Sequence, residues 1–282
     1  MTTRRGITRT GSILDRIVAD KREALEAAKR GTPEAALGDF AAEHDAHWGM
    51  TQAISTPRGA APTGAAVQIV AEIKKASPSR GVLAETLDPE AIAGAYTRGG
   101  AAAISVVTER NHFLGDLEWL RRVRNRLAED HPGTRPSLLR KDFLVDPYEL
   151  LEAKAYGADN ILLIVAILDD TLLGDMLARA RELELDALVE VHNEAEAARA
   201  VKAGATLFGI NNRDLHTFNV DLGTTERVRP LLPADAIVIG ESGVHTKVDV
   251  ERLHRAGVRA ILVGEAFMTA PDVAAKMAEL RL

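Results

Sequence analysis

The chain has 282 residues, of which 46% are hydrophobic, 27% charged and only 4% aromatic, and its net charge is −6. This composition matches soluble globular proteins with an aliphatic core, and the dispersed basic residues give no electrostatic footprint for nucleic acid. The chain has no cysteine and no apolar run near the roughly 20 residues that span a bilayer, so disulfides, thiolate metal sites and a membrane span are excluded. We expect a cytoplasmic protein with neither a nucleic-acid nor a membrane partner.

Residues 1–66 read as an N-terminal extension without a motif of its own. A helix is predicted over residues 12–30, because Ser12 can cap it, Asp15 falls in its first turn and Gly31 can end it. Its apolar stripe consists of Ile13, Leu14, Ile17, Val18 and Leu25. A second short helix is predicted from Pro33 to about His44, and residues 56–66 are irregular. The apolar face of the first helix must pack on another element.

From Val67 onward one sequence pattern recurs: a predicted helix ends in glycine, and a small residue and an aliphatic strand follow it. The four copies lie at residues 99–107, 157–164, 204–210 and 257–263. Glycine past a helix end takes the left-handed conformation, and each apolar run is short enough for a buried parallel strand. Four matching joints indicate a repeated unit.

Further strands are expected at residues 67–73, 137–141, 187–191 and 236–240, which gives eight. Helices are expected between them at about 88–98, 116–129, 147–156, 170–183, 193–203, 222–231, 246–256 and 271–281. The segment 67–282 then has about 27 residues per unit, close to what the eightfold βα (TIM) barrel requires. A doubly wound open sheet is the alternative, but no Gly-rich dinucleotide loop follows the first strand. We predict an α/β barrel, with residues 1–66 packing on its mouth.

Polar residues gather where the predicted strands end, which is the rim that carries the active site in such barrels. Strand alternation places each of them on the inward face. The candidate catalytic residues are Glu72, Lys74, Lys141, Glu190, Asn211 and Glu241. Three carboxylates and two lysines at one mouth shift one another's pKa values, which favours proton transfer without a metal. The eight histidines show no zinc spacing, and surface or capping roles are expected for them.

A second pattern indicates phosphate binding. Ser242-Gly243 and Gly264-Glu265 follow the seventh and eighth strands, where barrels commonly hold a phosphoryl group on backbone N–H groups. Arg213 and Lys74 can add positive charge. The alternative is that these glycines form only tight turns between strand and helix.

Six segments together resemble the indole-3-glycerol phosphate synthase family. They are AEIKKASPSRG at 71–81, RKDF at 140–143, LVEVH at 188–192, GINNRDL at 209–215, GESGV at 240–244 and VGEAFM at 263–268. The resemblance covers almost the whole chain. It implies substrate contacts from Ser77, Phe143 and Arg213 and a phosphate site at Ser242, Gly243, Gly264 and Glu265. One departure is Asp116, where serine is usual in the family.

The family resemblance implies a reaction in which a phosphorylated aryl-amino ketose closes its indole ring with loss of carbon dioxide and water, without a cofactor. It suggests Lys141 as the acid for ring closure and Glu190 for the dehydration, with Lys74 at the substrate carboxylate. Phe113, Phe143 and Leu163 are candidates for an apolar wall around the aromatic ring. Two alternatives are a ketose isomerase of the phosphoribosylanthranilate isomerase type and a binding protein without catalysis. The chain is expected to be a monomer or a weak homo-oligomer.

Overall fold

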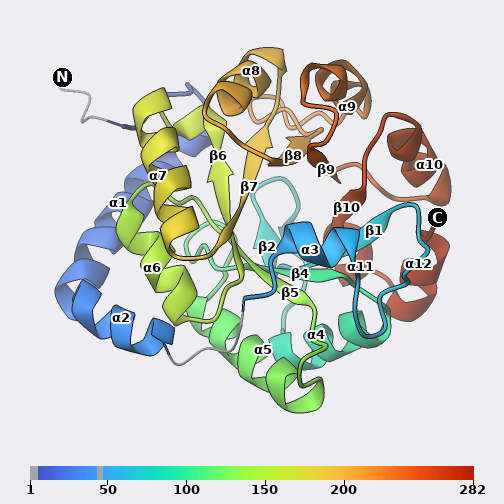
Figure 1. The fold of residues 1–282 in the computed structure, drawn as a ribbon, viewed down its shortest axis with the longest axis horizontal. Coiled ribbons are helices and arrows are strands. Elements are labelled where there is room, and N and C mark those ends of the chain that lie inside the picture. The colour runs from blue at the N-terminus through green and yellow to red at the C-terminus, as the bar shows by residue number, and fades with distance from the viewer. Residues whose placement is uncertain (1–5, 43–46) are drawn as a thin grey trace.

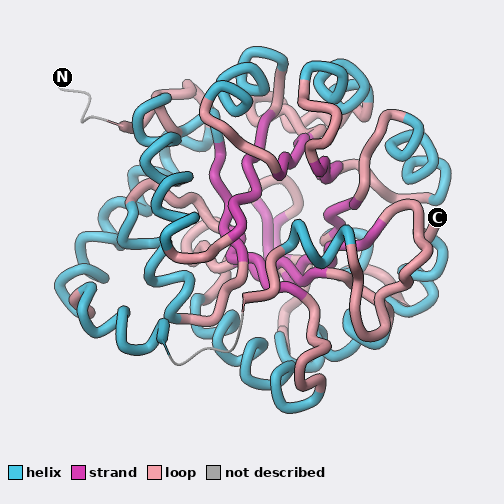
Figure 2. The backbone as a smooth tube through the Cα atoms, in the orientation of Figure 1, coloured by secondary structure: helices cyan, strands magenta, loops and turns pink. Residues whose placement is uncertain are grey.

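The computed structural model describes residues 6–42 and 47–282. Within these residues, eight parallel strands close into a barrel, with neighbours in the order β1, β10, β9, β8, β7, β6, β5 and β4 (Figures 1 and 2). The strands are β1 (Gln68–Ile73), β4 (Ala103–Val107), β5 (Ser137–Lys141), β6 (Asn160–Ile164), β7 (Asp186–Val191), β8 (Leu207–Asn211), β9 (Ile237–Glu241) and β10 (Ala260–Val263). The predicted TIM barrel is therefore confirmed.

Helices surround the strands, as Figure 2 shows by its cyan ring around the magenta barrel. The helices that follow the barrel strands are α4 (Pro89–Arg98), α5 (Leu117–Asp130), α6 (Pro147–Ala155), α7 (Asp170–Glu182), α8 (Glu194–Lys202), α9 (Gly223–Val228), α10 (Lys247–Arg255) and α12 (Val273–Glu279). Short 3₁₀ turns η1 (Val165–Ile167) and η2 (Arg229–Leu231) follow β6 and α9. Side-chain caps fix several helix starts, as at Asp88, Asp146 and Thr246. Each predicted helix is found at its expected place.

The glycines between each of four helices and the strand that follows have the expected left-handed conformation. Gly100, Gly157, Gly204 and Gly257 have φ between 78° and 91°, a region that L side chains rarely adopt. Each is followed within a few residues by a buried strand, so the repeated pattern in the sequence does mark the turn from helix into barrel.

The strand register sets which side chains face the barrel interior. Glu72 of β1 lies opposite Ser105 of β4, and Lys141 of β5 lies opposite Val107. Adjacent residues in a parallel register share a face, so the polar strand ends point into the barrel while the alternate residues pack under the helices. The predicted inward face is confirmed.

The N-terminal helix α1 (Ile13–Gly31) begins after Ser12, whose side chain accepts a hydrogen bond from the N–H of Leu14. Its residues Ile13, Leu14 and Ile17 line the cavity at the carboxyl ends of the strands. Helix α2 (Glu34–Ala42) follows and packs beside α6. The expected end of this second helix, at His44, lies outside the described residues.

A third helix, α3 (Met50–Ser55), was not predicted from the sequence, and it lies at the opposite end of the barrel. The N–H of Met50 donates to Oδ1 of Asn160 at 2.7 Å, and the N–H of Thr51 donates to Oδ2 of Asp186 at 2.8 Å. Asn160 and Asp186 begin β6 and β7, so these bonds close the amino-terminal end of the barrel, and Figure 1 shows α3 crossing in front of the strands. The extension thus reaches both ends of the barrel, whereas the sequence indicated the mouth alone.

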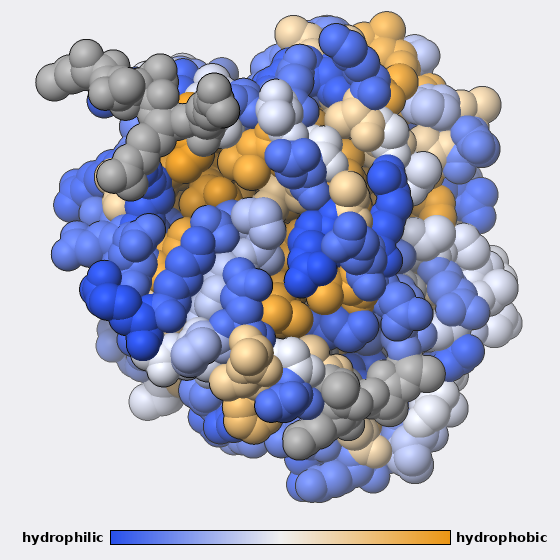
Figure 3. Space-filling view, turned by 60° about the vertical axis from the view of Figure 1, so that its left-hand side comes forward, coloured by the Kyte–Doolittle hydropathy of each residue, from blue (hydrophilic) through white to orange (hydrophobic). Residues whose placement is uncertain are grey.

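The outer surface carries most of the charge. Figure 3 shows one face on which hydrophilic residues predominate and hydrophobic residues appear in patches between them. The large hydrophobic side chains that are exposed come from separate parts of the chain, and they are Phe40, Val82, Leu114, Val220, Leu231 and Val248. Among the described residues, no helix is both long and apolar enough to cross a membrane.

Candidate active site

One cavity opens at the carboxyl ends of the strands, beneath α1. The predicted site residues that line it are Glu72, Lys74, Ser77, Phe113, Lys141, Phe143, Glu190, Asn211, Arg213, Glu241, Ser242, Gly243, Gly264 and Glu265. They come from seven of the barrel strands or the loops that follow them. Closing the barrel therefore brings together side chains that are up to 193 positions apart in the chain.

Leu163 is the exception, and its prediction as part of the apolar wall is wrong. Its register partner on β7 is Val189, one residue before the inward-facing Glu190, so Leu163 points out of the barrel and is fully buried beneath the helices. The neighbours Leu162 and Ile164 line the cavity instead. The sequence marked only residues 161–164 as the strand, and this run is aliphatic on both faces, so it gave no polar marker of its inward face.

Lys141, the last residue of β5, lies at the centre of the cluster. Its Nζ is 3.1 Å from Oε2 of Glu190 and 3.4 Å from Oε2 of Glu241. Burial alone would lower the pKa of Lys141, but Glu190, Glu241 and Glu72 outweigh it and hold the pKa well above its usual range. The ammonium is therefore charged at neutral pH and keeps a proton that it can donate.

Glu190, on β7, has a cation on each side. Oε2 faces Lys141, and Oε1 lies 3.2 Å from Nε2 of His192. Burial alone would raise the pKa of Glu190, but the two cations outweigh it and hold the pKa well below its usual range. His192 was expected at the surface or in a cap, yet its side chain is only 10% exposed and touches this carboxylate. Its position two residues after Glu190, on the same face of the strand, is the signal that could have revealed it.

Glu241, at the end of β9, is a buried carboxyl group whose pKa is raised. Burial raises its pKa to about 8; Lys141 opposes the shift, while Glu190 and Glu72 add to it. Space for the carboxyl comes from Gly209 on β8, because a Cβ at that position would lie 2.0 Å from Oε1 of Glu241. The surroundings thus push the pKa values of the two carboxyl groups apart, lowering that of Glu190 and raising that of Glu241.

Glu72 and Lys74 form a second pair at the end of β1, with 2.5 Å between Oε1 and Nζ. Gly264 lies against this pair, since a Cβ there would be 2.4 Å from Oε1 of Glu72. The glycine after β10 therefore makes room for a charged side chain as well as forming a turn.

Asn211 and Ser242 link the ends of β8 and β9 through a bond of 2.9 Å between Oδ1 and Oγ. Ser242 and Gly243 both have positive φ, 62° and 82°, which turns the backbone sharply at the predicted phosphate position. The buried Asn212, which sequence reasoning missed, supports this turn, because its Nδ2 donates to the carbonyls of Glu241 and Ser242 at 3.0 and 3.3 Å.

Phe113 and Phe143 form an aromatic wall on one side of the cavity, with ring centroids 5.8 Å apart. The loop that carries Phe113 is ordered by the buried carboxylate of Glu109, which accepts bonds from three successive N–H groups, including that of Phe113 at 2.9 Å. Asp116 then caps α5 through the N–H of Glu118. Because aspartate and serine are both favoured caps, the departure at Asp116 leaves the start of this helix intact.

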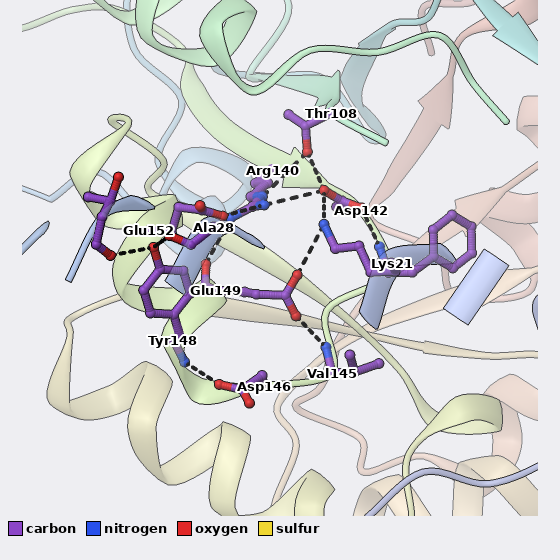
Figure 4. A network of polar contacts seen from close by, with 12 residues as sticks. Lys21, Ala28, Thr108, Arg140, Asp142, Val145, Asp146, Tyr148, Glu149 and Glu152 are labelled. Carbon is purple, nitrogen blue, oxygen red and sulfur yellow. Dashed lines mark hydrogen bonds and ion pairs between the residues drawn. The ribbon is translucent and has the colours of Figure 1, made fainter. Parts of the chain in front are cut away.

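A buried polar network attaches α1 to the end of β5 (Figure 4). Nζ of Lys21 lies 2.7 Å from Oδ2 of Asp142 and 3.0 Å from Oε1 of Glu149. Arg140 bonds the same Asp142 oxygen and pairs with Glu152 at 2.9 Å. Asp142 follows Lys141 directly, so the helix over the cavity and the central lysine are held by neighbouring residues.

The loop after β1 contacts the loop that follows the neighbouring strand β10. It contains a small hairpin, β2 (Ala76–Ser77) and β3 (Gly81–Val82), where only a loop was predicted. Arg80 in its turn pairs with Glu265 at 2.8 Å. Glu265 begins the four-residue helix α11 (Glu265–Met268) after β10, so two loops meet over the cavity.

These features define the class of protein: a TIM-barrel enzyme with an acid–base cluster, an aromatic wall and a backbone turn suited to an anion, all in one cavity. Among the described residues, no group of three or more histidine or acidic side chains is arranged to hold a metal ion.

A family model described as indole-3-glycerol phosphate synthase matches residues 14–280, and the chain belongs to that family. An indole-3-glycerol phosphate synthase from Dehalococcoides mccartyi is 45% identical over 268 residues, which cover 95% of this chain and 99% of the relative. The synthase from a Roseiflexus species is 44% identical over 274 residues, covering 95% and 98%.

Solved structures support the fold independently. A 3-hexulose-6-phosphate synthase superposes with a TM-score of 0.57 at 19% identity, covering 76% of this chain and 98% of its own. A thiamine phosphate pyrophosphorylase from Pyrococcus furiosus gives 0.56 at 18% identity, covering 76% and 94%. At such low identity these likenesses bear on the fold alone.

Proposed function

We propose that this chain converts 1-(2-carboxyphenylamino)-1-deoxyribulose 5-phosphate into indole-3-glycerol phosphate, carbon dioxide and water, as its family membership indicates. The observation that carries the proposal is Lys141, a buried ammonium between Glu190 and Glu241, in a cavity that also holds an aromatic pair and the Ser242 turn. Each part has a use in this one reaction.

Ring closure joins an aromatic carbon of the substrate to the ketose carbonyl carbon. The carbonyl oxygen must gain a proton as that bond forms, and Lys141 is the general acid that supplies it. A positioned general acid contributes roughly a hundredfold or more to the rate. Loss of carbon dioxide from the same aromatic carbon then restores the aromatic ring.

The dehydration that follows removes the new hydroxyl group and a neighbouring proton to form the indole double bond. Glu190 is the principal partner in this step, since it is ionised and becomes more basic once Lys141 has given up its proton. Lys74 engages the substrate carboxylate and can provide a later proton. Glu72, Glu241 and Asn211 orient these groups.

The remaining site residues bind the substrate. The phosphate lies at the backbone N–H groups of Ser242-Gly243 and Gly264-Glu265, with Arg213 adding charge, and Phe113, Phe143 and Ser77 contact the rest of the molecule. We propose residues 1–66 as an N-terminal helical extension that packs on the mouth of the catalytic barrel of residues 67–282, and cytoplasm as the location. The proposed partner is this small phosphorylated substrate, bound by a monomer or a weak homo-oligomer.

An assay of the purified chain with the aryl-amino ketose tests the proposal. One carbon dioxide per turnover and an indole product are expected in buffer without added cofactor or metal. A product of the same mass as the substrate would instead identify a ketose isomerase, and binding without turnover would identify a binding protein.

A further inference from the structure

His192 is a buried residue in the catalytic cluster for which the reaction scheme above has no use. It directly follows β7 and continues the alternation of that strand, so its ring lies on the side of Glu190. Its Nε2 is 3.2 Å from Oε1 of Glu190, and its Nδ1 is 3.0 Å from Oε2 of Glu196, which lies in the first turn of α8. The histidine therefore bridges a carboxylate inside the cavity and one at the start of a helix.

Nδ1 hydrogen-bonds Oε2 of Glu196, and Nε2 lies 3.2 Å from Oε1 of Glu190 without a well-directed hydrogen bond to it, so each ring nitrogen has a carboxylate oxygen close by. A neutral imidazole has one N–H, so its other nitrogen would point a lone pair at a carboxylate oxygen about 3 Å away. Only the imidazolium donates from both nitrogens. Burial alone would lower the pKa of His192, but the two nearby carboxylates, Glu190 and Glu196, outweigh it and raise the pKa to about 10.

The outer carboxylate is itself held in place. Glu196 Oε2 accepts the backbone N–H of His192 at 2.8 Å, and Oε1 accepts the side-chain amide of Asn193 at 2.8 Å. The N–H of Glu196 donates to Asn193, the cap of α8. The start of this helix thus presents a fixed anion to the ring.

The other charged groups of the cluster lie on strands that are not direct neighbours of β7. They are Lys141 on β5, Glu241 on β9 and Glu72 on β1. The two strands that flank β7 place the uncharged residues Ile164 and Gly209 beside Glu190. The imidazole is therefore the cation on the outer side of Glu190 and Lys141 is the cation on its inner side.

We propose that His192 is a positioning residue, an imidazolium anchored by Glu196 that keeps the Glu190 carboxylate ionised and turned toward Lys141. Its effect on catalysis rests on the proposed function, whereas its charge is a property of the folded chain. When Lys141 gives its proton away, His192 remains as the cation that holds Glu190 in place for the next step.

The charge is measured directly by NMR of the histidine side-chain nitrogens, with the His192 signals assigned by their loss in His192→Gln. At pH 8, protons on both nitrogens of His192 are expected. In Glu196→Gln, the titration midpoint of His192 should move to lower pH. A singly protonated His192 ring at pH 8 in the unmodified chain would overturn the proposal, whether or not the chain has synthase activity.

The kinetic consequence is measured with His192→Gln, whose amide can bond Glu190 but carries no charge. Removing the cation raises the pKa of Glu190, so the acid limb of kcat/KM should move to higher pH by about one to two units. The variant should lose more activity relative to the unmodified chain at the most acidic pH at which both proteins remain folded than at pH 8. Melting temperatures at both pH values separate this effect from unfolding.

His254→Gln is the matched control, since it removes an exposed histidine on α10, and its pH profile should be unchanged. If His192→Gln does not fold, His192→Asn provides the same test. A loss of activity by the same factor at every pH, in a variant that remains folded, would show a merely structural role and overturn the proposal. A chain with no synthase activity would refute the proposed function, and the NMR result would still decide the charge of His192.

Discussion

Replacing Lys21 by methionine should destabilise the protein strongly, although Lys21 lies outside the reacting groups. Its Nζ contacts Asp142 at 2.7 Å and Glu149 at 3.0 Å, and the side chains of both acids are only 1% exposed. Methionine keeps most of the length and apolar area of the lysine but leaves two buried carboxylates with less compensation. The variant therefore measures the effect of the Lys21 charge on stability, with little change in side-chain packing.

The magnitude follows from burial. Burial alone would raise the pKa of Asp142, but Lys21 and Arg140 outweigh it and lower the pKa from 3.8 to about 2. At about 1.4 kcal/mol per unit, this shift corresponds to about 2 to 3 kcal/mol. Removing one partner of a buried pair costs about 3 to 5 kcal/mol. We therefore expect the free energy of unfolding to fall by about 2 to 5 kcal/mol at pH 7. The loss should be smaller toward pH 4, because the carboxylates left without Lys21 take up protons.

Lys29→Met provides a matched control on the same helix. Lys29 contacts Asp146 at the same 2.7 Å, but its side chain is 35% exposed and that of Asp146 is 29% exposed. Such a pair contributes no more than about 1 kcal/mol. Urea unfolding of the three proteins at pH 7, followed by circular dichroism, compares their free energies of unfolding. Equal losses in the two variants would refute the argument from burial.

Three further predictions concern the cavity. Gly243→Val should weaken binding of the phosphorylated substrate far more than Ser242→Ala does, because Gly243 has φ of 82° and a Cβ there would lie 2.5 Å from Cγ1 of Val220; equal rises in KM would count against a backbone phosphate site. Gly209→Ala should lower kcat more than tenfold, since its methyl group displaces the Glu241 carboxyl, and an unchanged kcat in a folded variant would contradict this. The pKa of Glu241 is raised from 4.5 to about 8. The protonated Glu241 side chain therefore makes its full contribution to the free energy of unfolding below pH 4.5, and this contribution is lost as the pH rises to about 8. Glu241→Gln should therefore flatten the fall in melting temperature between pH 5 and 9, and a fall as steep as before would contradict the assignment.

The barrel could be predicted from the sequence because the patterns that mark its helices, turns and strands are short and recur along the chain. Each glycine joint, such as Gly157, fixes a turn, and each apolar run after it is short enough only for a strand. The site was predictable for a related reason, since a residue such as Lys141 or Glu190 at the end of a strand has its face set by alternation.

The parts that the sequence did not predict depend on contacts between distant segments. Helix α3 has only six residues, too few for a helical periodicity, and it is held by bonds to the starts of β6 and β7. Leu163 lies in the run of residues 161–164, which is aliphatic on both faces of the strand. The importance of Lys21 depends on Asp142, which lies 121 positions away in the chain.

The central claim is that Lys141 acts in ring closure and Glu190 in the later dehydration, and a single-turnover experiment with rapid quenching and mass spectrometry tests it most directly. Lys141→Ala should bind the substrate and accumulate nothing beyond it, because the acid for the first step is gone. Glu190→Gln keeps the shape of the side chain and should consume the substrate, accumulating an intermediate that has lost carbon dioxide but not water. Identical profiles for the two variants, with no intermediate in either, would contradict this division of roles.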